Sequence, residues 1–541
     1  MSLILQIILI GLGNRRKYSA GNKIAFVLWL PYLCADSIAI ISLGILSCSQ
    51  GKCSDAFLDL DYVVMAFWAP FLLLQLGGPD TITAYSLEDN ELWLQHLLRL
   101  IVEVAVAIYI FVRSMKPTQL NLLAIPMLVA GLIKFGERTW VLRSASNSHL
   151  MEEGDALIIA YDFFLTSKHL RPFFQRITCK NAFRVIEMEL GFMHDVLFTK
   201  ATIVHFWGGV LRSISFSSTT AALTAFCLID LSGYSSVNVM TSLILLVGAI
   251  GLEMYAILVL LSSDWTMLWI KNLRAETRRL ISRVHSLSIN KRWSNCVAQY
   301  NMLSSCLENW TVRCCGLVNW IHKQLEDYQD DQVEPVSDYL KKSVFNQLLE
   351  KSLKALDFRL CKELCSYRGK WELEKHECIE KLGWSIDVDG NQNPDNANSS
   401  RGEAIRVILN YMMFILMKRP FMLPDGIGQI RLQDTHAEAE DFVQERKIID
   451  KSDVCKKLLE VDTRISPIDV KGDWSKSEVM MEVWIEMLCY VACHCQWNHH
   501  AQQLRRGGEL LIHVWILMTH LDISEQFQIS QGHARTKLRV K

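Results

Sequence analysis

The densest group of possible metal ligands lies near the C-terminal end of the sequence. It combines cysteine and histidine, the side chains that zinc prefers, and comprises Cys489, Cys493, His494, Cys495, His499 and His500. Cys489 with Cys493 and His494 with His499 have permitted pair spacings, but the pairs abut without the loop of about 12 residues around which a zinc finger folds. The alternative is that the cysteines are small core residues, and the spacing favours this alternative over a metal site.

A second group of chemically capable residues lies inside apolar runs. Asp36, Glu103 and Glu253 each interrupt such a run, and a charge within a bilayer costs several kcal/mol unless it is paired, protonated or hydrated. One interpretation is a path for an ion or proton. The other is that the carboxylates bond neighbouring polar groups and hold helices together, or are neutral because of burial. The second interpretation needs fewer assumptions about function. Lys134, at the end of a run, is expected to extend its ammonium group to the membrane interface.

Motifs of well-known enzyme chemistries are missing from the sequence. It contains no Gly-x4-Gly-Lys-Ser/Thr loop, no Gly-x-Gly-x-x-Gly turn, no Gly-x-Ser-x-Gly elbow and no His-Glu-x-x-His pair. We therefore assign no catalytic residue and no cofactor. A formal net charge of -1 over 541 residues also argues against a nucleic-acid partner.

The elements that carry these residues divide the chain into two parts. Half of the residues are hydrophobic, and the mean hydropathy of +0.17 is typical of a mixture of membrane and soluble segments. Residues 1–262 are predicted to be a transmembrane region with about seven spans and a cytosolic loop at 136–212. The expected spans are 2–13, 24–47, 62–76, 97–112, 120–135, 213–229 and 237–261.

Charge predicts the orientation of these spans, because Lys and Arg near span ends remain on the cytosolic side. One basic flank runs from Arg15 to Lys23 and the other follows the last span. An even number of crossings between them predicts an N-terminus outside and a cytosolic C-terminal half. The second flank is expected to lie on the membrane surface, where anionic lipid attracts basic side chains: Lys271, Arg274, Arg278, Arg279 and Arg283.

The C-terminal half has helical periodicity, so the predicted fold class is all-α: a polytopic transmembrane helix bundle followed by a mainly helical cytosolic region. Its expected parts are an amphipathic helical region at 263–386, a flexible loop rich in turn-forming residues at 387–401, a helical domain at 402–525 and a basic tail at 526–541. Two helices are expected at 479–497 and 507–521, with Trp484, Leu488, Leu510, Val514 and Leu517 as core residues.

Several long motifs resemble a known family. The segments are LWLPYLCADSIAIISLGILS at 28–47, FWAPFLLLQLGGPDTITAYSL at 67–87, KFGERTWVL at 134–142, LVGAIGLE at 246–253, SDW at 263–265 and KRWSNCVAQYN at 291–301. They resemble the plant membrane proteins classed as domain of unknown function 4220. Residues 483–521 resemble the companion domain of unknown function 594. The resemblance implies a plant multi-pass membrane protein, and it carries no catalytic residue over.

Three functions remain open from the sequence. The leading hypothesis is a non-enzymatic interaction or regulatory protein, whose partners are the lipid bilayer and unidentified cytosolic or membrane proteins. The second is a transporter or channel that uses Asp36, Glu103 and Glu253, which requires these carboxylates to meet in one cavity. The third is a metal-dependent membrane-anchored enzyme, which requires Cys489, Cys493 and two nearby histidines to approach one ion.

Overall fold

The computed structural model describes most of the chain. The described residues are 1–19, 22–51, 60–113, 119–146, 170–201, 208–229, 234–269, 292–302, 304–306, 332–354, 358–376, 396–424, 428–446, 476–507 and 509–523. The surface residues Lys271, Arg274, Arg278, Arg279 and Arg283 lie outside this set, as do the predicted tail at 526–541 and residues 387–395 of the predicted loop.

The fold is mainly helical. The elements of the first half are α1 (Ser2–Gly13), η1 (Asn14–Tyr18), α2 (Asn22–Gly51), α3 (Leu60–Leu76), α4 (Leu87–Glu91), α5 (Trp93–Arg113), α6 (Gln119–Ser144), α9 (Leu170–Phe174), α10 (Cys179–Phe198), α12 (Gly208–Leu228), α13 (Ser236–Leu261) and α14 (Asp264–Trp269). The remaining elements are β1 (Cys296–Gln299), β2 (Gln332–Pro335), α18 (Asp338–Lys354), α19 (Phe358–Ser366), α20 (Lys370–Lys375), α21 (Asn396–Lys418), η4 (Pro420–Met422), α22 (Gly428–Glu445), α24 (Lys476–His494), α25 (Trp497–Gln503), η5 (Leu504–Arg506) and α26 (Leu510–His520).

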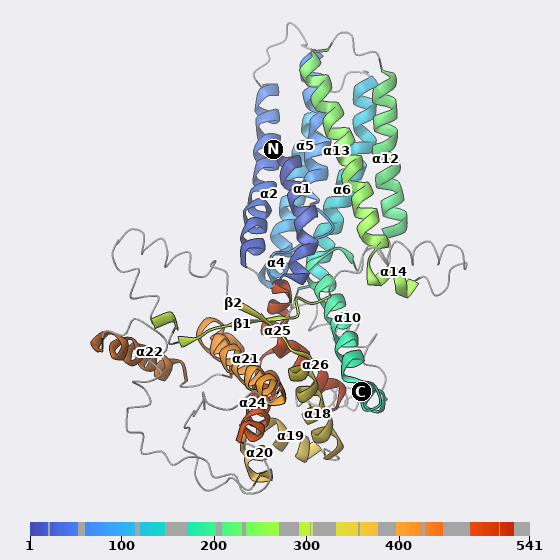
Figure 1. Cartoon of the computed structure of the whole chain (residues 1–541). Coiled ribbons are helices and arrows are strands. Elements are labelled where there is room, and N and C mark those ends of the chain that lie inside the picture. The colour runs from blue at the N-terminus through green and yellow to red at the C-terminus, as the bar shows by residue number, and fades with distance from the viewer. Residues whose placement is uncertain are drawn as a thin grey trace, which may run out of the picture.

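The long helices of the first half stand side by side as an upright bundle. Figure 1 shows α1, α2, α5, α6, α12 and α13 in this bundle, with α10, α14 and the C-terminal helices below its lower end. α3 belongs to the same bundle, since it packs against α2, α5, α6 and α13. We call the lower end, where α1 and α13 finish, the base of the bundle.

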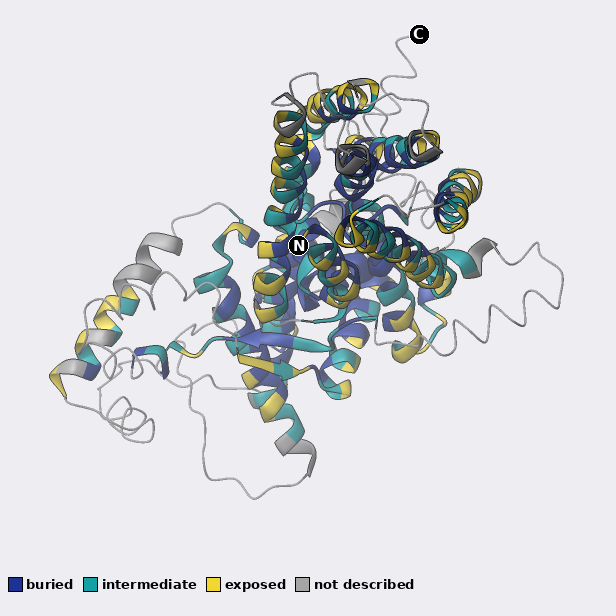
Figure 2. Ribbon diagram, turned by 90° about the horizontal axis from the view of Figure 1, so that it is seen from above, coloured by how far each residue is buried: buried dark blue, intermediate teal, exposed yellow. Residues whose placement is uncertain are grey.

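Three of these helices are long and apolar enough to span a membrane: Lys23–Cys48, Trp93–Val112 and Ser236–Leu261. Their outer faces are apolar, and large exposed side chains include Leu30 on α2, Leu98 on α5 and Val247 on α13. Figure 2 shows that buried positions lie mainly toward the interior and exposed positions on the outer faces of the helices. An apolar outer surface around a packed interior is suited to contact with a lipid bilayer.

Small residues let the bundle helices approach closely. A Cβ atom on Gly131 of α6 would lie 3.2 Å from the backbone nitrogen of Leu74 on α3, and one on Gly248 of α13 would lie 2.7 Å from Leu3 Cδ2 on α1. Because dispersion rather than water exclusion drives packing within lipid, close backbone approach at glycine is a favoured way to join such helices.

The C-terminal domain packs α18, α21 and α26 against α24 or one another. β1 and β2 form an antiparallel pair with Cys296 opposite Pro335, and β1 contacts α21. The prediction of an all-α fold missed this small sheet. Strands of four residues are too short to show a clear alternation of apolar and polar residues in the sequence. The predicted core residues Leu488, Leu510, Val514 and Leu517 are buried, and Trp484 is partly buried against the same core.

The start of α21 corrects one sequence-based boundary. α21 begins at Asn396, within the stretch 387–401 for which the sequence predicts a flexible loop. The turn-forming residues Asn and Ser are also preferred at helix N-termini, because their side chains satisfy free backbone N–H groups. Their composition therefore fits a helix start as well as a loop.

The bundle and the C-terminal domain share one hydrophobic core. Ala84 and Leu142, from the base of the bundle, belong to the same buried cluster as α10 and α26. Polar contacts cross the same junction: Arg16 Nε donates to the carbonyl oxygen of Arg505 at 3.0 Å, and His520 Nε2 lies 2.6 Å from Glu189 Oε2.

Candidate functional site

A buried network of charges lies inside the base of the bundle and centres on Glu253. This carboxylate is fully buried, and both oxygens have partners from other helices. Lys134 Nζ of α6 lies 2.5 Å from Oε1, while Arg212 Nη1 of α12 lies 2.9 Å from Oε2. Ser215 also donates to Oε1 at 3.1 Å. The network therefore joins α6, α12 and α13, and a buried carboxylate with this many donors is stable in its charged form.

Asp80 extends the network from the bundle into the turn that follows α3. Its Oδ2 accepts a hydrogen bond from Arg212 Nη2, and its Oδ1 lies 3.8 Å from Lys200 Nζ. Lys200 is completely buried and donates to the carbonyl oxygens of Gly77 at 2.8 Å and Lys134 at 3.3 Å. Burial lowers the pKa of the Lys200 ammonium to about 8.

Two glycines explain how the turn reaches this position. A Cβ atom on Gly77 would lie 2.7 Å from Lys134 Cβ, so only glycine lets the end of α3 approach α6 this closely. Gly78 follows with φ +67°, a left-handed conformation in which glycine commonly ends helices. The chain then turns and carries Asp80 toward Arg212.

A cavity of about 120 Å³ lies beside the network, and its described lining includes three ion pairs. The first is Arg212 with Asp80. In the second, Lys17 Nζ lies 3.0 Å from Asp195 Oδ1. In the third, Arg292 donates from Nε and Nη2 to the two oxygens of Asp264 at 3.1 and 2.8 Å. The described charged groups of the lining thus balance as three cations and three carboxylates.

The electrostatics of the Lys17–Asp195 pair keep both groups charged. Burial alone would raise the pKa of the Asp195 carboxyl, but the Lys17 ammonium and the adjacent His194 hold it below its usual value. Burial works in the opposite direction on the Lys17 ammonium, whose pKa is nevertheless raised by Asp195. Burial also lowers the pKa of His194, so that side chain remains neutral at neutral pH.

The structure separates the carboxylates that the sequence grouped as a transport path. Asp36 Oδ1 of α2 accepts a hydrogen bond from Arg138 Nη1 at 2.9 Å, whereas Glu253 bonds Lys134 and Arg212. Glu103 is buried on α5, and none of the contacts of Asp36 or Glu253 described above involves it. Asp36 and Glu253 therefore have different cationic partners, Arg138 for the first and Lys134 and Arg212 for the second.

The expectation for Lys134 is wrong. Its ammonium group does not extend to the interface but points to Glu253, and its side chain is buried. Pairing with a buried carboxylate replaces the hydration that an interface would have supplied.

The six sequence-predicted metal residues are used in other contacts. His494 Nδ1 lies 2.9 Å from the carbonyl oxygen of Tyr490, and His500 Nε2 lies 3.1 Å from that of Ala492. Burial raises the pKa of the Cys489 and Cys495 thiols to about 12, which disfavours the thiolate that binds zinc. Cys493 Sγ lies 3.3 Å from Cys365 Sγ, and His499 packs edge-on against Phe421.

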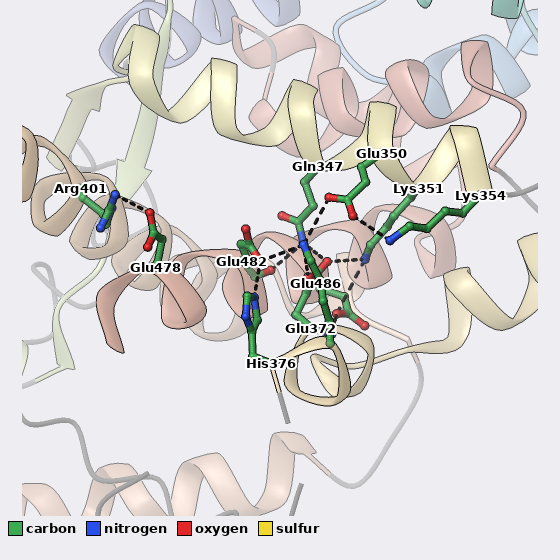
Figure 3. Close-up of polar contacts among 11 residues, drawn as sticks. Gln347, Glu350, Lys351, Lys354, Glu372, His376, Arg401, Glu478, Glu482 and Glu486 are labelled. Carbon is green, nitrogen blue, oxygen red and sulfur yellow. Dashed lines mark hydrogen bonds and ion pairs between the residues drawn. The ribbon is translucent and has the colours of Figure 1, made fainter. Parts of the chain in front are cut away.

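A different group has metal-ligand geometry, and Figure 3 shows it between α20 and α24. Within the described residues, Glu372, His376 and Glu482 place their ligand atoms within 4.8 Å of one another. His376 Nε2 lies 2.8 Å from Glu482 Oε2. The ammonium of Lys375 lies 3.4 Å from Glu372 Oε2 and 3.3 Å from Glu482 Oε2. A side-chain cation therefore already neutralises the two carboxylates.

Lys351 completes this second network from α18. It is buried, and its Nζ lies 3.6 Å from Glu372 Oε1 and 3.7 Å from Glu486 Oε2. Glu486 in turn accepts the backbone N–H of Glu372 at 3.0 Å. This N–H belongs to the first turn of α20, where backbone donors have no partner within the helix. The network fixes α20 between α18 and α24.

The segments that resemble a known family supply most charges at the base of the bundle. They include Asp36, Asp80, Lys134, Arg138, Glu253, Asp264 and Arg292. Sequence reasoning missed Asp80 and Arg212, although Arg212 directly precedes the predicted span 213–229 and Asp80 follows the span 62–76 by four residues. It also missed Glu372 and His376, whose i, i+4 spacing suits one helical face.

Comparisons with known proteins agree with this resemblance. No curated protein and no solved structure matches the chain. The family model described as domain of unknown function, DUF4220, matches residues 29–157 and 154–306. The model described as protein of unknown function, DUF594, matches residues 471–523. These matches cover the bundle from residue 29 of α2 onward, the Glu253 network and the helices α24 to α26. The chain therefore belongs to the DUF4220 family and carries a C-terminal DUF594 domain.

Proposed function

We propose that this protein is a non-enzymatic interaction or regulatory protein of a membrane. Its bundle resides in the bilayer, and its C-terminal domain presents a binding surface to cytosolic or membrane proteins. The two parts act as one unit, so that a change at the base of the bundle reaches the C-terminal domain.

The junction between the two parts is the observation that carries this proposal. Arg16, directly after α1, is buried and donates to the carbonyl oxygens of Tyr85 and Arg505. η1 packs against η5, and α10 packs against both η5 and α26. A buried guanidinium that bonds two backbone carbonyls fixes relative position strongly, because losing either bond leaves a charge without an acceptor.

The proposed topology has about seven spans, an outside N-terminus and a cytosolic C-terminal half. Its support is that Lys17, from the first basic flank, and Arg292, which follows α14 in the chain, line the same cavity at the base. The base also contacts the C-terminal domain, which is consistent with the rule that positive flanks stay inside. Each expected span coincides with a bundle helix, although α1 has 12 residues and is about 18 Å long.

The alternatives receive less support from the geometry. A transport path through Asp36, Glu103 and Glu253 requires one shared cavity, but Asp36 and Glu253 have different cationic partners. A metal-dependent enzyme built on the predicted cysteines and histidines requires thiolate ligands, but burial raises the pKa of the Cys489 and Cys495 thiols to about 12.

The topology is tested by glycosylation mapping of the full chain. An acceptor inserted within residues 52–59, between α2 and α3, is expected to be glycosylated. The native acceptor at Asn309-Trp310-Thr311 is expected to remain unmodified. A glycan on Asn309 would overturn the proposed orientation.

The interaction function is tested by proximity labelling from the C-terminus of the full chain. The wild-type protein is expected to label a reproducible set of proteins that a labelling enzyme on an unrelated membrane anchor does not label. Arg16→Gln is expected to change this set, whereas Arg15→Gln, at an exposed position, is the matched control. The proposal fails if the wild type labels only what the anchor labels, or if both variants label the wild-type set.

A further inference from the structure

Three sulfur atoms from three helices of the C-terminal domain lie close together. Cys493 Sγ of α24 is 3.3 Å from Cys365 Sγ of α19 and 3.9 Å from Met518 Sδ of α26. Both cysteines are reduced thiols. Because 128 positions separate them in the chain, the two thiols meet only in the folded domain.

The separation of the two thiols is close to that of a disulfide bond. A disulfide has an S–S length of about 2.05 Å, so the two sulfur atoms must approach each other by about 1.3 Å. Rotation of the two side chains about their Cα–Cβ bonds produces displacements of this size. α19 already packs against α24, and the bond therefore requires no new contact between helices.

Burial of the pair selects a small oxidant. Cys365 is 1% exposed and Cys493 is 6% exposed, so a bulky disulfide reagent has no access to either sulfur. A small neutral molecule such as hydrogen peroxide enters when the domain opens locally. The second thiol is then already beside the oxidised sulfur, which favours a disulfide over further oxidation to a sulfinic acid.

The Cys365 thiol also supports the end of α26. It donates a hydrogen bond to the carbonyl oxygen of Ile523, with Sγ and the oxygen 2.6 Å apart. Ile523 is buried and follows Asp522, whose φ of +58° is uncommon for a residue with a side chain. A disulfide has no S–H group, so oxidation removes this hydrogen bond from a buried carbonyl.

The same end of α26 contacts the elements that lead to the bundle. Ser352 of α18 donates to the carbonyl oxygen of Leu521 at 3.1 Å. His520 Nε2 lies 2.6 Å from Glu189 Oε2 of α10. A change at the Ile523 carbonyl is therefore two or three residues from contacts at the junction of the two parts.

We propose that Cys365 and Cys493 form a redox-sensitive pair that hydrogen peroxide converts to a disulfide. First, the sulfur of one deprotonated thiol attacks peroxide and breaks the O–O bond; it becomes a sulfenic acid, and the released hydroxide takes up the thiol proton as water. The other sulfur then attacks the sulfenic sulfur, and the S–O bond breaks. Its hydroxyl group leaves as water with the second thiol proton, so two thiols reduce one peroxide to two waters.

The disulfide links α19 to α24 and loosens the end of α26. In the proposed cytosolic location the reduced pair is the resting state, because cytosolic thiols are kept reduced. Only this resting state depends on the proposed orientation. The reaction itself is measured on purified protein, so its failure is distinct from a failure of the proposed function.

The first test uses the full chain, purified in a maltoside detergent, reduced, and then treated with hydrogen peroxide at neutral pH. Remaining thiols are alkylated after denaturation, and the digested peptides are analysed by mass spectrometry. We expect two peptides joined through Cys365 and Cys493, lighter by two hydrogen atoms than the reduced pair and separated by dithiothreitol. Recovery of both cysteines in alkylated form, or of either one as a sulfinic acid or joined to a different cysteine, would overturn the proposal.

The second test separates the disulfide from the hydrogen bond. Cys365→Ala and Cys493→Ala should both abolish the linked peptide, but only Cys365→Ala removes the donor to Ile523. In the reduced protein, amide hydrogen exchange at residues 518–523 should be about fivefold faster in Cys365→Ala than in the wild type and unchanged in Cys493→Ala. Cys495→Ala, at a neighbouring buried cysteine, is the control and should retain both the disulfide and the wild-type exchange rate.

Oxidation of the wild type should accelerate exchange at residues 518–523 as Cys365→Ala does. Unchanged exchange in the oxidised wild type would reject the effect on α26. Equal acceleration in Cys365→Ala and Cys493→Ala would show that the contact with Ile523 is not what holds this end of the helix.

Discussion

Arg16 Nε and the carbonyl oxygen of Arg505 lie 3.0 Å apart, although 489 positions separate the two residues in the chain. The bond connects η1 to η5 of the DUF594 domain. Because Arg16 also bonds the carbonyl oxygen of Tyr85, one side chain joins three segments of the chain at the junction.

Replacing Arg16 should loosen this junction. Arg16→Gln cannot reach both carbonyls, and the loss of charge-assisted hydrogen bonds at a buried position should cost about 2 to 3 kcal/mol. We expect a lower thermal midpoint and faster proteolytic release of the C-terminal domain in detergent. Arg15→Gln, at an exposed neighbouring position, should behave as the wild type. Equal proteolysis rates for the two variants would show that Arg16 does not hold the junction.

The Asp36–Arg138 pair should be strongly coupled. Asp36→Asn leaves the buried Arg138 guanidinium without its carboxylate, which should cost about 3 kcal/mol or more. Arg138 retains its bond to the carbonyl oxygen of Leu76 at 2.9 Å. The double variant Asp36→Asn, Arg138→Gln should lose less stability than the two single variants lose together. Thermal unfolding of the wild type and the three variants, compared as a double-mutant cycle, measures this difference. Strict additivity would indicate that the two side chains act independently.

Two lysines on α18 should differ sharply in their effect on stability. Lys351 is buried between Glu372 and Glu486, so Lys351→Met should leave buried carboxylates uncompensated and cost about 3 to 5 kcal/mol. Lys354 is 44% exposed in its pair with Glu350, and Lys354→Met should cost less than about 1 kcal/mol. Chemical unfolding of both variants measures the difference. Similar midpoints would contradict the assignment of Lys351 to the network in Figure 3.

Close approach of α3 and α6 should make Gly77 intolerant of a side chain. Gly77→Ala would place a Cβ atom 2.7 Å from Lys134 Cβ, whereas a Cβ on Gly136 of α6 would meet no atom within 4 Å. We expect a clear drop in thermal midpoint for Gly77→Ala and a neutral or slightly stabilising effect for Gly136→Ala, since alanine favours helix. Equal thermal midpoints for the two variants would mean that α3 and α6 move apart without a loss of stability.

Acid should destabilise the DUF594 domain through its buried histidines. Burial lowers the pKa of His500 to about 4 and that of His513 to about 3. Unfolded histidine has a pKa of about 6.5, so below about pH 6.5 the unfolded state binds more protons than the folded state. Stability should therefore fall as pH falls, by about 1.4 kcal/mol per pH unit for each histidine.

Tryptophan fluorescence during thermal unfolding at pH 7.5 and 5.0 measures this slope. His500→Phe retains an aromatic ring beside Trp515, whose ring centroid lies 4.7 Å from that of His500, and should reduce the slope. His436→Phe is the control, because His436 is on α22, outside the DUF594 domain. A slope unchanged by His500→Phe would assign the acid sensitivity to other groups.

The positions of the long helices follow from sequence, while their charged contacts do not. The run at 237–261 matches α13 within one residue at its start, because apolar length alone determines such a helix. The run at 120–135 stops early, since α6 continues to Ser144 through Glu137 and Arg138. Both side chains are buried in the tertiary structure, and a hydropathy criterion ends a span at such charges.

The site was the harder part because its residues meet only after folding. Lys134 and Glu253 belong to helices far apart in the chain, so spacing could not pair them. The Cys/His cluster showed the opposite problem: its residues are close in sequence, but backbone carbonyls and core packing occupy His494, His500 and Cys493. Proximity in the chain was therefore a poor guide to a shared ligand.

The Glu253 network has a consequence for biosynthesis. Lys134 and Arg212 are synthesised before Glu253, and Arg212 precedes it by 41 residues. The chain therefore makes α6 and α12, with their cations, before the carboxylate that bonds both of them. Asp80, which is made earlier, already supplies Arg212 with a carboxylate, so Lys134 is the cation whose pairing with Glu253 waits for α13. A chain that stops short of α13 would leave the Lys134 ammonium without this carboxylate.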